Sequence, residues 1–383
     1  MSDEFFSANE YNARLGRLRE TMAARGVDVC LISTPENIFY LAGLDHWGYF
    51  APHLLIVPAR GDMTLVTRAM ERVTIGRQVR NAWFEGHSDS ETAGDAAVRT
   101  LRDLGLGSSV IGVEAWSAGL PHGLAERLKR GLAEAAWTDV SGWVDDLRLV
   151  KSPAEQAYMR AAARVSDATA AAAIEAIRKG ASERDVAARA HAAMIAAGGT
   201  FPGFGPFIRS TERLGEEHTS WGDATFADGD AVFLELSGCV RRYHAPLGRL
   251  IHVGRVPAGA REMAAICHDA FDAVIAALRP GALARDVYAA WQKTVDAAGL
   301  GHYRRHHCGY VIGIGVPPSW SGGNKVVGLR SDSELEVKAG MTFHILSWLM
   351  GTGRGDFFVS DTVLLGPSGA ETLTRTPSDV IVR

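Results

Sequence analysis

The sequence lacks the features that mark several classes of protein. It has no block of lysine and arginine, and its formal net charge is −4 at pH 7. It has no apolar run of about 18 residues, the length that crosses a bilayer. Its acidic start, MSDEFFSANEY, lacks the apolar core of a signal peptide. These absences predict a protein whose partners are neither nucleic acid nor a membrane surface.

Cysteine is scarce and phosphate-binding loops are missing. The chain has four cysteines, widely spaced and without a CxxC motif, a pattern typical of free thiols in a reducing cytoplasm. The glycine-rich segment 313–323, GIGVPPSWSGG, is interrupted by two prolines, which suits a loop better than a helix start over a pyrophosphate. We therefore expect a cytoplasmic protein without a nucleotide cofactor.

The length and the order of predicted elements indicate two domains. A chain of 383 residues is too long for one ordinary core. Strands and helices alternate over residues 1–148, which predicts an α/β domain. In the remainder, 149–383, Ser152, Pro153 and Glu155 form a capping-box pattern that opens a long helix. Further helices and strand pairs follow, so we predict an α+β domain with helices packed on an antiparallel sheet.

One stretch of this second domain places an acid inside an apolar strand. Residues 231–250, AVFLELSGCVRRYHAPLGRL, predict two adjacent strands with a turn at Ser237–Gly238. Glu235 lies within the first strand, where a carboxylate is costly unless it has partners. It either faces a polar side of the sheet or pairs with an arginine, or it is an active-site carboxylate.

The second domain resembles a known superfamily through landmarks that occur in a fixed order. After RLVKSPAEQAYMRAAA come EEHTSW, ADGDAVFLELSG, YHAPLGR, HHCGYVIGIGV, KAGMTFHI and FFVSDTVLL. This order resembles the pita-bread superfamily of methionine aminopeptidase, prolidase, aminopeptidase P and creatinase. The resemblance implies a pita-bread catalytic domain behind a creatinase-like N-terminal α/β domain. It also implies a homodimer, in which Trp47 either reaches the partner's active site or packs in the core of its own domain.

The residues that bind metal in this superfamily are replaced here. Its metal-dependent members hold two divalent ions with two Asp, one His and two Glu. By resemblance, these positions fall on Glu235, Pro246, Tyr310, Leu346 and Ser360. Proline and leucine offer no side-chain lone pair, and neutral tyrosine or serine is a weak ligand. We therefore expect no metal, and none at His306-His307-Cys308 either, because neighbouring strand residues point to opposite faces.

The strings GCVRRYHAPLGR, GYVIGIGVPPSW, KAGMTFH and HTSW resemble the metal-independent ectoine hydrolases. This resemblance implies a small zwitterionic substrate, a cyclic amidine that also bears a carboxylate. It further implies covalent attack on the amidine carbon, with Glu235 as the candidate nucleophile and His218 or His244 moving the proton. In a competing version, Glu235 only holds the amidinium while a histidine activates water.

Such a substrate requires a cation for its carboxylate and aromatic faces around its ring. The candidates for substrate binding are Arg249, Arg242, Tyr243, Trp221, Tyr310, Trp320, His344 and, from the N-terminal domain, Trp47. Three other functions stay open from the sequence: an Xaa-Pro metallopeptidase, a creatinase-like amidino hydrolase, and a small-molecule binder that has lost catalysis.

Overall fold

The computed structural model describes residues 5–383 and divides into two compact units. The first comprises the chain through Arg148 together with Gly323–Lys325, and the second comprises Leu149–Gly322 and Val326–Arg383. The three residues 323–325 depart from the predicted boundary. The Asn324 side chain accounts for this, because its amide donates to Asp145 (2.7 Å) and accepts from the Thr34 hydroxyl (3.0 Å), both in the first unit.

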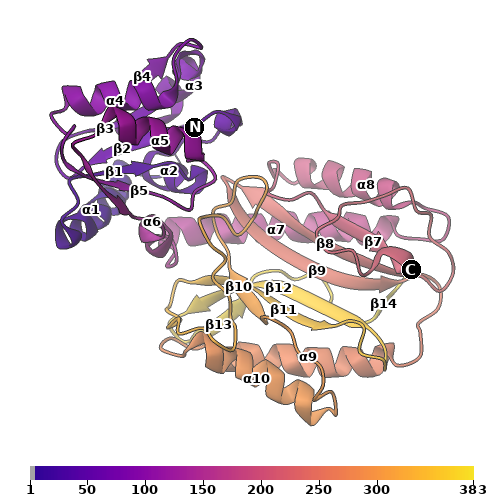
Figure 1. The fold of residues 1–383 in the computed structure, drawn as a ribbon. Coiled ribbons are helices and arrows are strands. Elements are labelled where there is room, and N and C mark those ends of the chain that lie inside the picture. Colours follow the sequence, from indigo (N-terminus) through magenta and orange to yellow (C-terminus); the bar gives the residue numbers. More distant parts are fainter. Residues whose placement is uncertain (1–4) are drawn as a thin grey trace. The chain divides into compact units, whose positions relative to one another are not determined.

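The first unit is built on a mixed six-stranded sheet in the order β4-β3-β2-β1-β5-β6 (Figure 1). Strands β1, β2 and β3 pair antiparallel, and the pairs β3–β4, β1–β5 and β5–β6 are parallel. Its elements are α1 (Ala8–Arg25), β1 (Val29–Ile32), α2 (Pro35–Ala42), η1 (Gly48–Phe50), β2 (Leu54–Pro58), β3 (Met63–Arg68), η2 (Ala69–Glu71), α3 (Arg72–Gln78), β4 (Ala82–His87), α4 (Ala93–Asp103), β5 (Val110–Val113), α5 (His122–Gly131), β6 (Ala136–Asp139) and α6 (Trp143–Leu147).

The second unit is built on an eight-stranded sheet whose main path runs β10-β11-β12-β9-β8-β7, with β13 beside β12 and β14 beside β9. Neighbours along the main path are antiparallel, as predicted. Its elements are α7 (Pro153–Ala176), α8 (Glu183–Ala196), β7 (Phe207–Ser210), η3 (Thr211–Arg213), β8 (Ala231–Val240), β9 (Tyr243–His252), α9 (Ala260–Ala277), α10 (Ala284–Ala297), β10 (Gly309–Val311), β11 (Thr342–Leu349), β12 (Phe357–Gly366), β13 (Gly369–Thr372) and β14 (Ile381–Val382).

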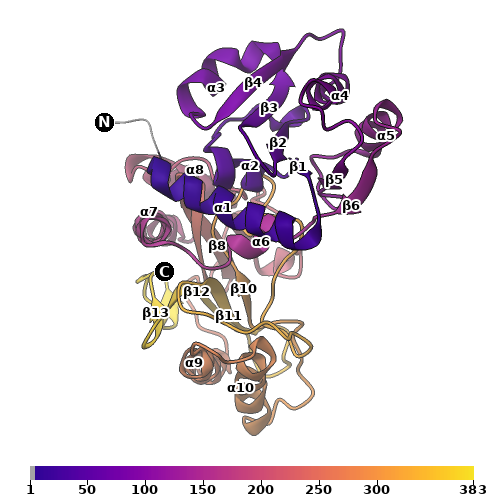
Figure 2. The ribbon, with the colours of Figure 1, turned by 90° about the vertical axis from the view of Figure 1, so that its left-hand side faces the viewer.

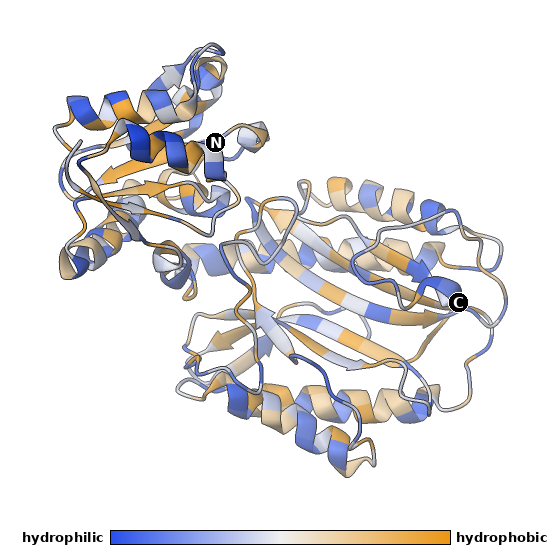
Figure 3. Cartoon of the chain, viewed as in Figure 1, coloured by the Kyte–Doolittle hydropathy of each residue, from blue (hydrophilic) through white to orange (hydrophobic). Residues whose placement is uncertain are grey.

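Two apolar cores attach helices to one face of this sheet. Residues from α7 and α8 pack on alternate side chains of β7, β8 and β9, such as Leu234, Leu236 and Leu247. Residues from α9 and α10 pack on β11 and β12 through side chains such as Phe343 and Val359. Figure 2 shows α9 and α10 side by side, and Figure 3 shows apolar residues recurring along the strands. The opposite face of the sheet, which we call the inner face, receives the intervening side chains.

The predicted start of α7 is confirmed. The Ser152 hydroxyl accepts from the Glu155 amide, and the Glu155 carboxylate accepts from the Ser152 amide, so the capping box closes with Pro153 in the first turn. This helix supports the underside of β8. The Cβ of any residue replacing Gly238 would lie 2.4 Å from the Ala162 carbonyl oxygen of α7.

The predicted turn at Ser237–Gly238 is wrong. Strand β8 continues through both residues to Val240, and the hairpin closes at Arg241–Arg242, which have φ angles of 53° and 66°. Two-residue turns with positive φ at both positions match the twist of the flanking strands, even though arginine is a rare choice there. Gly238 serves close packing against α7 instead of a turn.

The four cysteines are free and buried. Within residues 5–383, the structure has no helix with the length and apolarity that a membrane crossing needs.

Candidate active site

Glu235 lies at the centre of the inner face. Directly paired residues of antiparallel strands point to the same side of a sheet, and Glu235 pairs with Phe207 on β7 and Gly248 on β9. Gly248 pairs in turn with Ser360 on β12, and Ser360 with Leu346 on β11. One row of side-chain positions thus crosses five strands, with Glu235 as its only ionisable member.

A second row runs beside the first. Strand register places Pro246 opposite Ser237, Thr362 opposite His344, and His344 opposite Tyr310. The five positions that the resemblance assigns to metal ligands therefore all fall on these two neighbouring rows. Residues distant in sequence meet here because each strand contributes every second side chain.

Burial strongly perturbs the Glu235 carboxyl. The residue is 9% exposed, and no lysine or arginine of the described chain forms an ion pair with it. Loss of hydration raises its pKa to about 8; the positive charges of Arg209 and Arg305 oppose this rise, and Glu217 adds to it. The structure therefore does not support the interpretation that Glu235 pairs with an arginine. At neutral pH the isolated site holds mainly a protonated acid.

A hydrogen-bonded series of side chains flanks Glu235. Trp320 Nε1 donates to the Tyr310 hydroxyl at 2.8 Å, and that hydroxyl lies 2.9 Å from His344 Nδ1. His344 Nε2 lies 2.7 Å from Ser360 Oγ and 3.8 Å from Glu235 Oε1. Burial holds the pKa of His344 well below its ordinary value, so the ring is neutral. If Tyr310 donates its proton to Nδ1, the imidazole proton sits on Nε2, facing Ser360 and Glu235.

Gly248 keeps the space opposite Glu235 free of a side chain. A Cβ at this position would lie 2.3 Å from Phe358 Cε1 and 2.9 Å from Ser360 Oγ. Contacts this short require Phe358 to move, and Phe358 is held by stacking on Phe233, with ring centroids 4.8 Å apart. The row therefore combines an acid with an adjacent position that only glycine fits.

Aromatic rings and His218 lie along one margin of these rows. Phe204 packs on Trp320 at 4.7 Å between ring centroids, and Phe207 packs on Trp320 at 5.6 Å. His218 is exposed and has its ring 6.1 Å from Phe207, the cross-strand partner of Glu235. It also has a positive φ of 54°. His218 thus stands at the solvent side of the site.

His307 lies close to the same series, with its ring centroid 5.4 Å from that of Tyr310. Burial lowers the pKa of His307 to about 3. Within residues 5–383, no three His, Cys, Asp or Glu side chains come together in a way that could hold a metal ion. Cys308 is fully buried in the core beneath α9 and α10.

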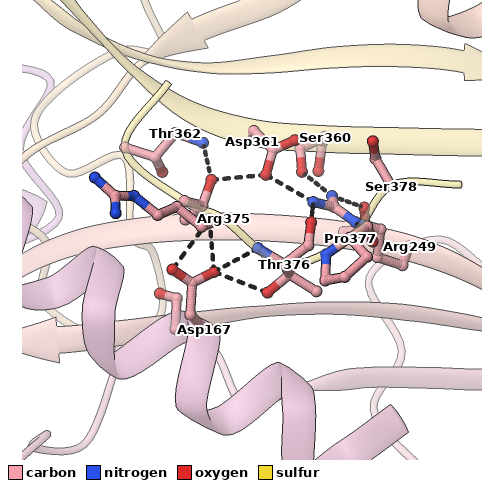
Figure 4. Close-up of polar contacts among 12 residues, drawn as sticks. Asp167, Arg249, Ser360, Asp361, Thr362, Arg375, Thr376, Pro377 and Ser378 are labelled. Atoms are coloured by element: carbon pink, nitrogen blue, oxygen red, sulfur yellow. Dashed lines mark hydrogen bonds and ion pairs between the residues drawn. The ribbon is translucent and has the colours of Figure 1, made fainter. Parts of the chain in front are cut away.

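Arg249 points to the opposite face of the sheet. It pairs with Leu234, which belongs to the helix-covered core. Its guanidinium donates to Asp361 (2.9 Å) and to the carbonyls of Gly248, Ser360, Thr376 and Pro377. Figure 4 shows these contacts beside Asp167, which accepts from the backbone of Arg375 and Thr376. All three guanidinium nitrogens are thus engaged in joining β9, β12 and the C-terminal segment.

Four other candidates are held away from Glu235 by internal contacts. His244 is fully buried, accepts from the Gly203 amide through Nε2 and contacts the Arg242 carbonyl through Nδ1; burial lowers its pKa to about 3. The Tyr243 hydroxyl donates to Glu155 on α7, and Arg242 donates to Thr200 and Phe201 from the hairpin turn. Trp221 packs against His191 of α8.

Trp47 belongs to the first unit, where it is 61% exposed. It precedes the short helix η1.

Sequence reasoning missed Arg209. This residue lies on β7, a strand that the sequence did not suggest, and pairs with Phe233 on the inner face, next to the row of Glu235. The signal was the alternation of Phe207 and Arg209 with Ile208, which faces the core. Strand β7 is too short for such alternation to stand out from a loop.

The residues present do not fit a pair of divalent ions. Pro246 and Leu346 occupy two of the five positions and cannot coordinate metal, and the phenol of Tyr310 is already bonded to Trp320 and His344. Burial also raises the pKa of that phenol, which opposes a metal-binding phenolate. One acid, Glu235, is left from the family's ligand set.

Comparison with known proteins agrees with this architecture. Residues 157–367 match the model of metallopeptidase family M24, and residues 14–150 match the creatinase/prolidase N-terminal domain. The chain belongs to metallopeptidase family M24. The predicted pita-bread domain behind a creatinase-like domain is thereby confirmed.

Individual relatives of this M24 chain differ in their named activities. It is 27% identical to the ectoine hydrolase of Halomonas elongata over 99% of this chain and 98% of that protein. It is 24% identical to the Xaa-Pro dipeptidase of Pyrococcus horikoshii over 97% and 99% of the two chains. The structure of an Xaa-Pro dipeptidase from Bacillus anthracis superposes with a TM-score of 0.85 at 21% identity, covering 97% of this chain and all of that one. All three of these relatives are hydrolases, which indicates that this chain is an enzyme as well.

The raised pKa of Glu235 makes a prediction about stability. Its pKa is about 8 in the folded protein against an ordinary value of 4.5, so the folded state retains a proton that the unfolded chain releases between these values. The free energy of unfolding should therefore fall as the pH rises from 5 to 9. Glu235→Gln lacks this titration, so between pH 5 and 9 its free energy of unfolding should rise relative to that of the wild type by on the order of 3 kcal/mol. Urea unfolding at a series of pH values measures it.

Glu371→Gln is the matched control. A hydrogen bond from Arg160 holds the pKa of Glu371 below its ordinary range, so this carboxyl does not titrate between pH 5 and 9. Its replacement should leave the pH slope unchanged. Parallel curves for wild type and Glu235→Gln would show that Glu235 is hydrated and ordinary in its acidity.

Proposed function

We propose that this protein is a metal-independent hydrolase that opens a small cyclic amidine, ectoine or 5-hydroxyectoine, to an N-acetyl diamino acid. The observation that carries the proposal is the isolation of Glu235. It is the single acid remaining on the inner-face rows where the family's metal ligands would stand. A buried carboxyl without a paired lysine or arginine favours a cationic ligand.

The chemistry follows from the substrate's charge. An amidinium is a flat cation with an electrophilic carbon between two nitrogens. Its approach stabilises the carboxylate form of Glu235, so binding should displace the proton that burial retains there. Glu235 thus becomes a carboxylate when the substrate binds and places its amidine carbon within reach.

In the covalent version, a Glu235 oxygen bonds to the amidine carbon. One ring C–N bond then breaks, and the leaving nitrogen takes a proton from a histidine imidazolium. Water then attacks the same carbon and gives a proton back to the imidazole; the bond to Glu235 breaks and the carboxylate returns, leaving an amide and a free amine. In the second version, Glu235 only neutralises the amidinium, and a histidine takes a proton from water as the water attacks the same carbon. Both versions consume one water for each ring opened.

Among the candidate histidines, His218 suits proton transfer best. It is exposed beside Phe207, whereas both nitrogens of His244 are engaged in the interior. We assign His344, Tyr310 and Trp320 to holding the substrate ring and orienting the groups around Glu235. Their mutual hydrogen bonds fix these side chains before the substrate binds.

The alternative functions are weaker on chemical grounds. An Xaa-Pro dipeptidase, as in several relatives, would need ligands that Pro246 and Leu346 do not supply. A creatinase-like amidino hydrolase would need glutamates where Gly248 and Leu346 stand. A binder without catalysis would hold the same cations but leave them unchanged, which the turnover experiment below distinguishes.

Turnover without metal is the first prediction of this proposal. Protein treated with a chelator and shown by elemental analysis to be free of metal should still open ectoine, followed by NMR through loss of the ring signals. The treated protein should not cleave proline dipeptides. Loss of amidine turnover on chelation with recovery on adding Mn²⁺ would contradict the proposal, as would unchanged ectoine.

The pH dependence of catalysis is the second prediction. Because kcat/KM reports groups of the free enzyme, it should rise with pH and level off above an apparent pKa near 8, the value of Glu235. The kcat profile should turn at lower pH, because the bound cation favours the carboxylate. Glu235→Gln should lower kcat by at least about 10³-fold. A flat kcat/KM between pH 6 and 9 would be inconsistent with this role.

We also propose a homodimer in which Trp47 lies near the partner's active site. The support is an exposed apolar group around η1, with Trp47 at 61% and Phe50 at 78% exposure. Light scattering should give twice the mass of one chain. Trp47→Ala should keep that mass and raise KM several-fold. A monomer with full activity would refute this arrangement.

A further inference from the structure

Arg209 is a buried cation on the inner face that no internal anion neutralises. The residue is 1% exposed, and its Nε and Nη1 atoms have no hydrogen-bond partner among residues 5–383. Removal from water lowers the pKa of its guanidinium, which marks the cost of burying this charge. Buried polar groups are nearly always satisfied, so two unused donors on one buried guanidinium require an explanation.

The position of Arg209 relative to Glu235 follows from strand register. Phe207 pairs with Glu235, and Arg209 pairs with Phe233, so Arg209 stands two residues further along β7 on the same face. Two residues of a strand span about 6.8 Å. The carboxylate and the guanidinium attract each other, as the mutual effect on their pKa values shows, but they do not form an ion pair.

An aromatic ring contacts the guanidinium of Arg209. Arg209 lies over Phe233 with 4.2 Å between its central carbon and the ring centroid. Phe233 itself packs against Phe358 and Trp348, at 4.8 and 5.3 Å between centroids, and these two rings also contact each other. A carboxylate binds a guanidinium through two parallel hydrogen bonds along an edge that pairs Nη2 with Nε or with Nη1. Each of the two unbonded nitrogens, Nε and Nη1, can therefore supply one bond of such a pair.

We infer that Arg209 binds the carboxylate of the substrate while Glu235 engages its amidinium. This inference rests on the proposed function. In it, the substrate is selected by its ring carboxylate, which lies three bonds from the amidine carbon. The two unpaired, opposite protein charges would each meet the opposite charge of one zwitterion. The role that the sequence assigned to Arg249 or Arg242 passes to Arg209, whose donors are not committed elsewhere.

Glu217 is the competing partner to consider. It exerts the largest attractive effect on the Arg209 guanidinium but is exposed in the turn after η3. An exposed carboxylate is hydrated and can yield to a substrate carboxylate, whereas an internal ion pair would not. The inference therefore predicts that Glu217→Gln leaves ectoine binding intact or strengthens it.

The decisive experiment compares two cyclic substrates, each with the wild type and with Arg209→Met. The rings are ectoine and 2-methyl-1,4,5,6-tetrahydropyrimidine, which is the same amidine without the carboxylate. Removing the Arg209 charge also raises the pKa of Glu235 further, which affects both rings alike, so the two rings are compared with each other. At pH 9, Arg209→Met should lower kcat/KM for ectoine by about 100-fold or more relative to kcat/KM for the ring without a carboxylate. For the ring without a carboxylate, the loss in kcat/KM should be limited to what the smaller ionised fraction of Glu235 causes. Equal losses on both rings, or no loss on ectoine, would overturn the inference.

Controls separate binding from folding. Arg209→Met should raise the melting temperature of the free protein by about 2 °C or more, because methionine packs on Phe233 without an unsatisfied charge. A structural role for Arg209 would lower it instead. Arg209→Lys should keep part of the ectoine activity. Arg304→Met, which removes an exposed arginine paired with Asp296, should change neither ring's kinetics.

The outcomes also distinguish this inference from the proposed function. If wild type opens neither ring, the proposed function fails, and calorimetry then decides the role of Arg209. Tighter binding of ectoine than of the ring without a carboxylate, lost in Arg209→Met, would support that role. Equal or absent binding of the two rings would reject it.

Discussion

The site depends on one physical constraint: the Glu235 carboxyl is buried in an apolar strand, and no paired cation compensates for its loss of hydration. In M24 enzymes that use metals, several acids share the charge of two ions. Here one acid remains, and the protein stabilises it by retaining a proton. The pKa of about 8 records the free energy stored in this arrangement. A cationic ligand can release that energy, so binding and ionisation are coupled.

The fold supplies the isolation that Glu235 requires. Helices α7 and α8 cover one face of β8 with Leu234 and Leu236, which leaves Glu235 on the inner face. The same alternation sends Arg249 into the helix-covered side, where it pairs with Asp361. Two arginines near one another in the sheet thus have opposite functions. Arg249 has all its nitrogens committed inside the protein, and Arg209 has two donors left for a ligand.

Much of this could be predicted from sequence where local signals are strong. The capping box at Ser152 defined the start of α7, and the ordered landmarks identified the pita-bread domain. The residue opposite Glu235 could not be predicted, because the turn was placed at Ser237–Gly238 when the chain turns at Arg241–Arg242. The actual register places Gly248 there, whereas the predicted turn would have placed Val240 there; Arg249 lies on the face opposite Glu235 in either register. Gly238 is there for α7, a tertiary contact that no local pattern reveals. Strand β7 was missed for a similar reason: four residues form a strand only because β8 offers them a ladder.

The most direct test of whether burial keeps Glu235 protonated is to measure the acidity of this carboxyl itself. Carboxyl NMR on protein labelled with ¹³C-glutamate, assigned by comparison with Glu235→Gln, gives the pKa of this group alone. We expect a pKa of about 8 in the free protein and a fall below 7 when acetamidinium, a small flat cation, is bound. A pKa near 4.5 that acetamidinium does not move would contradict this role of burial.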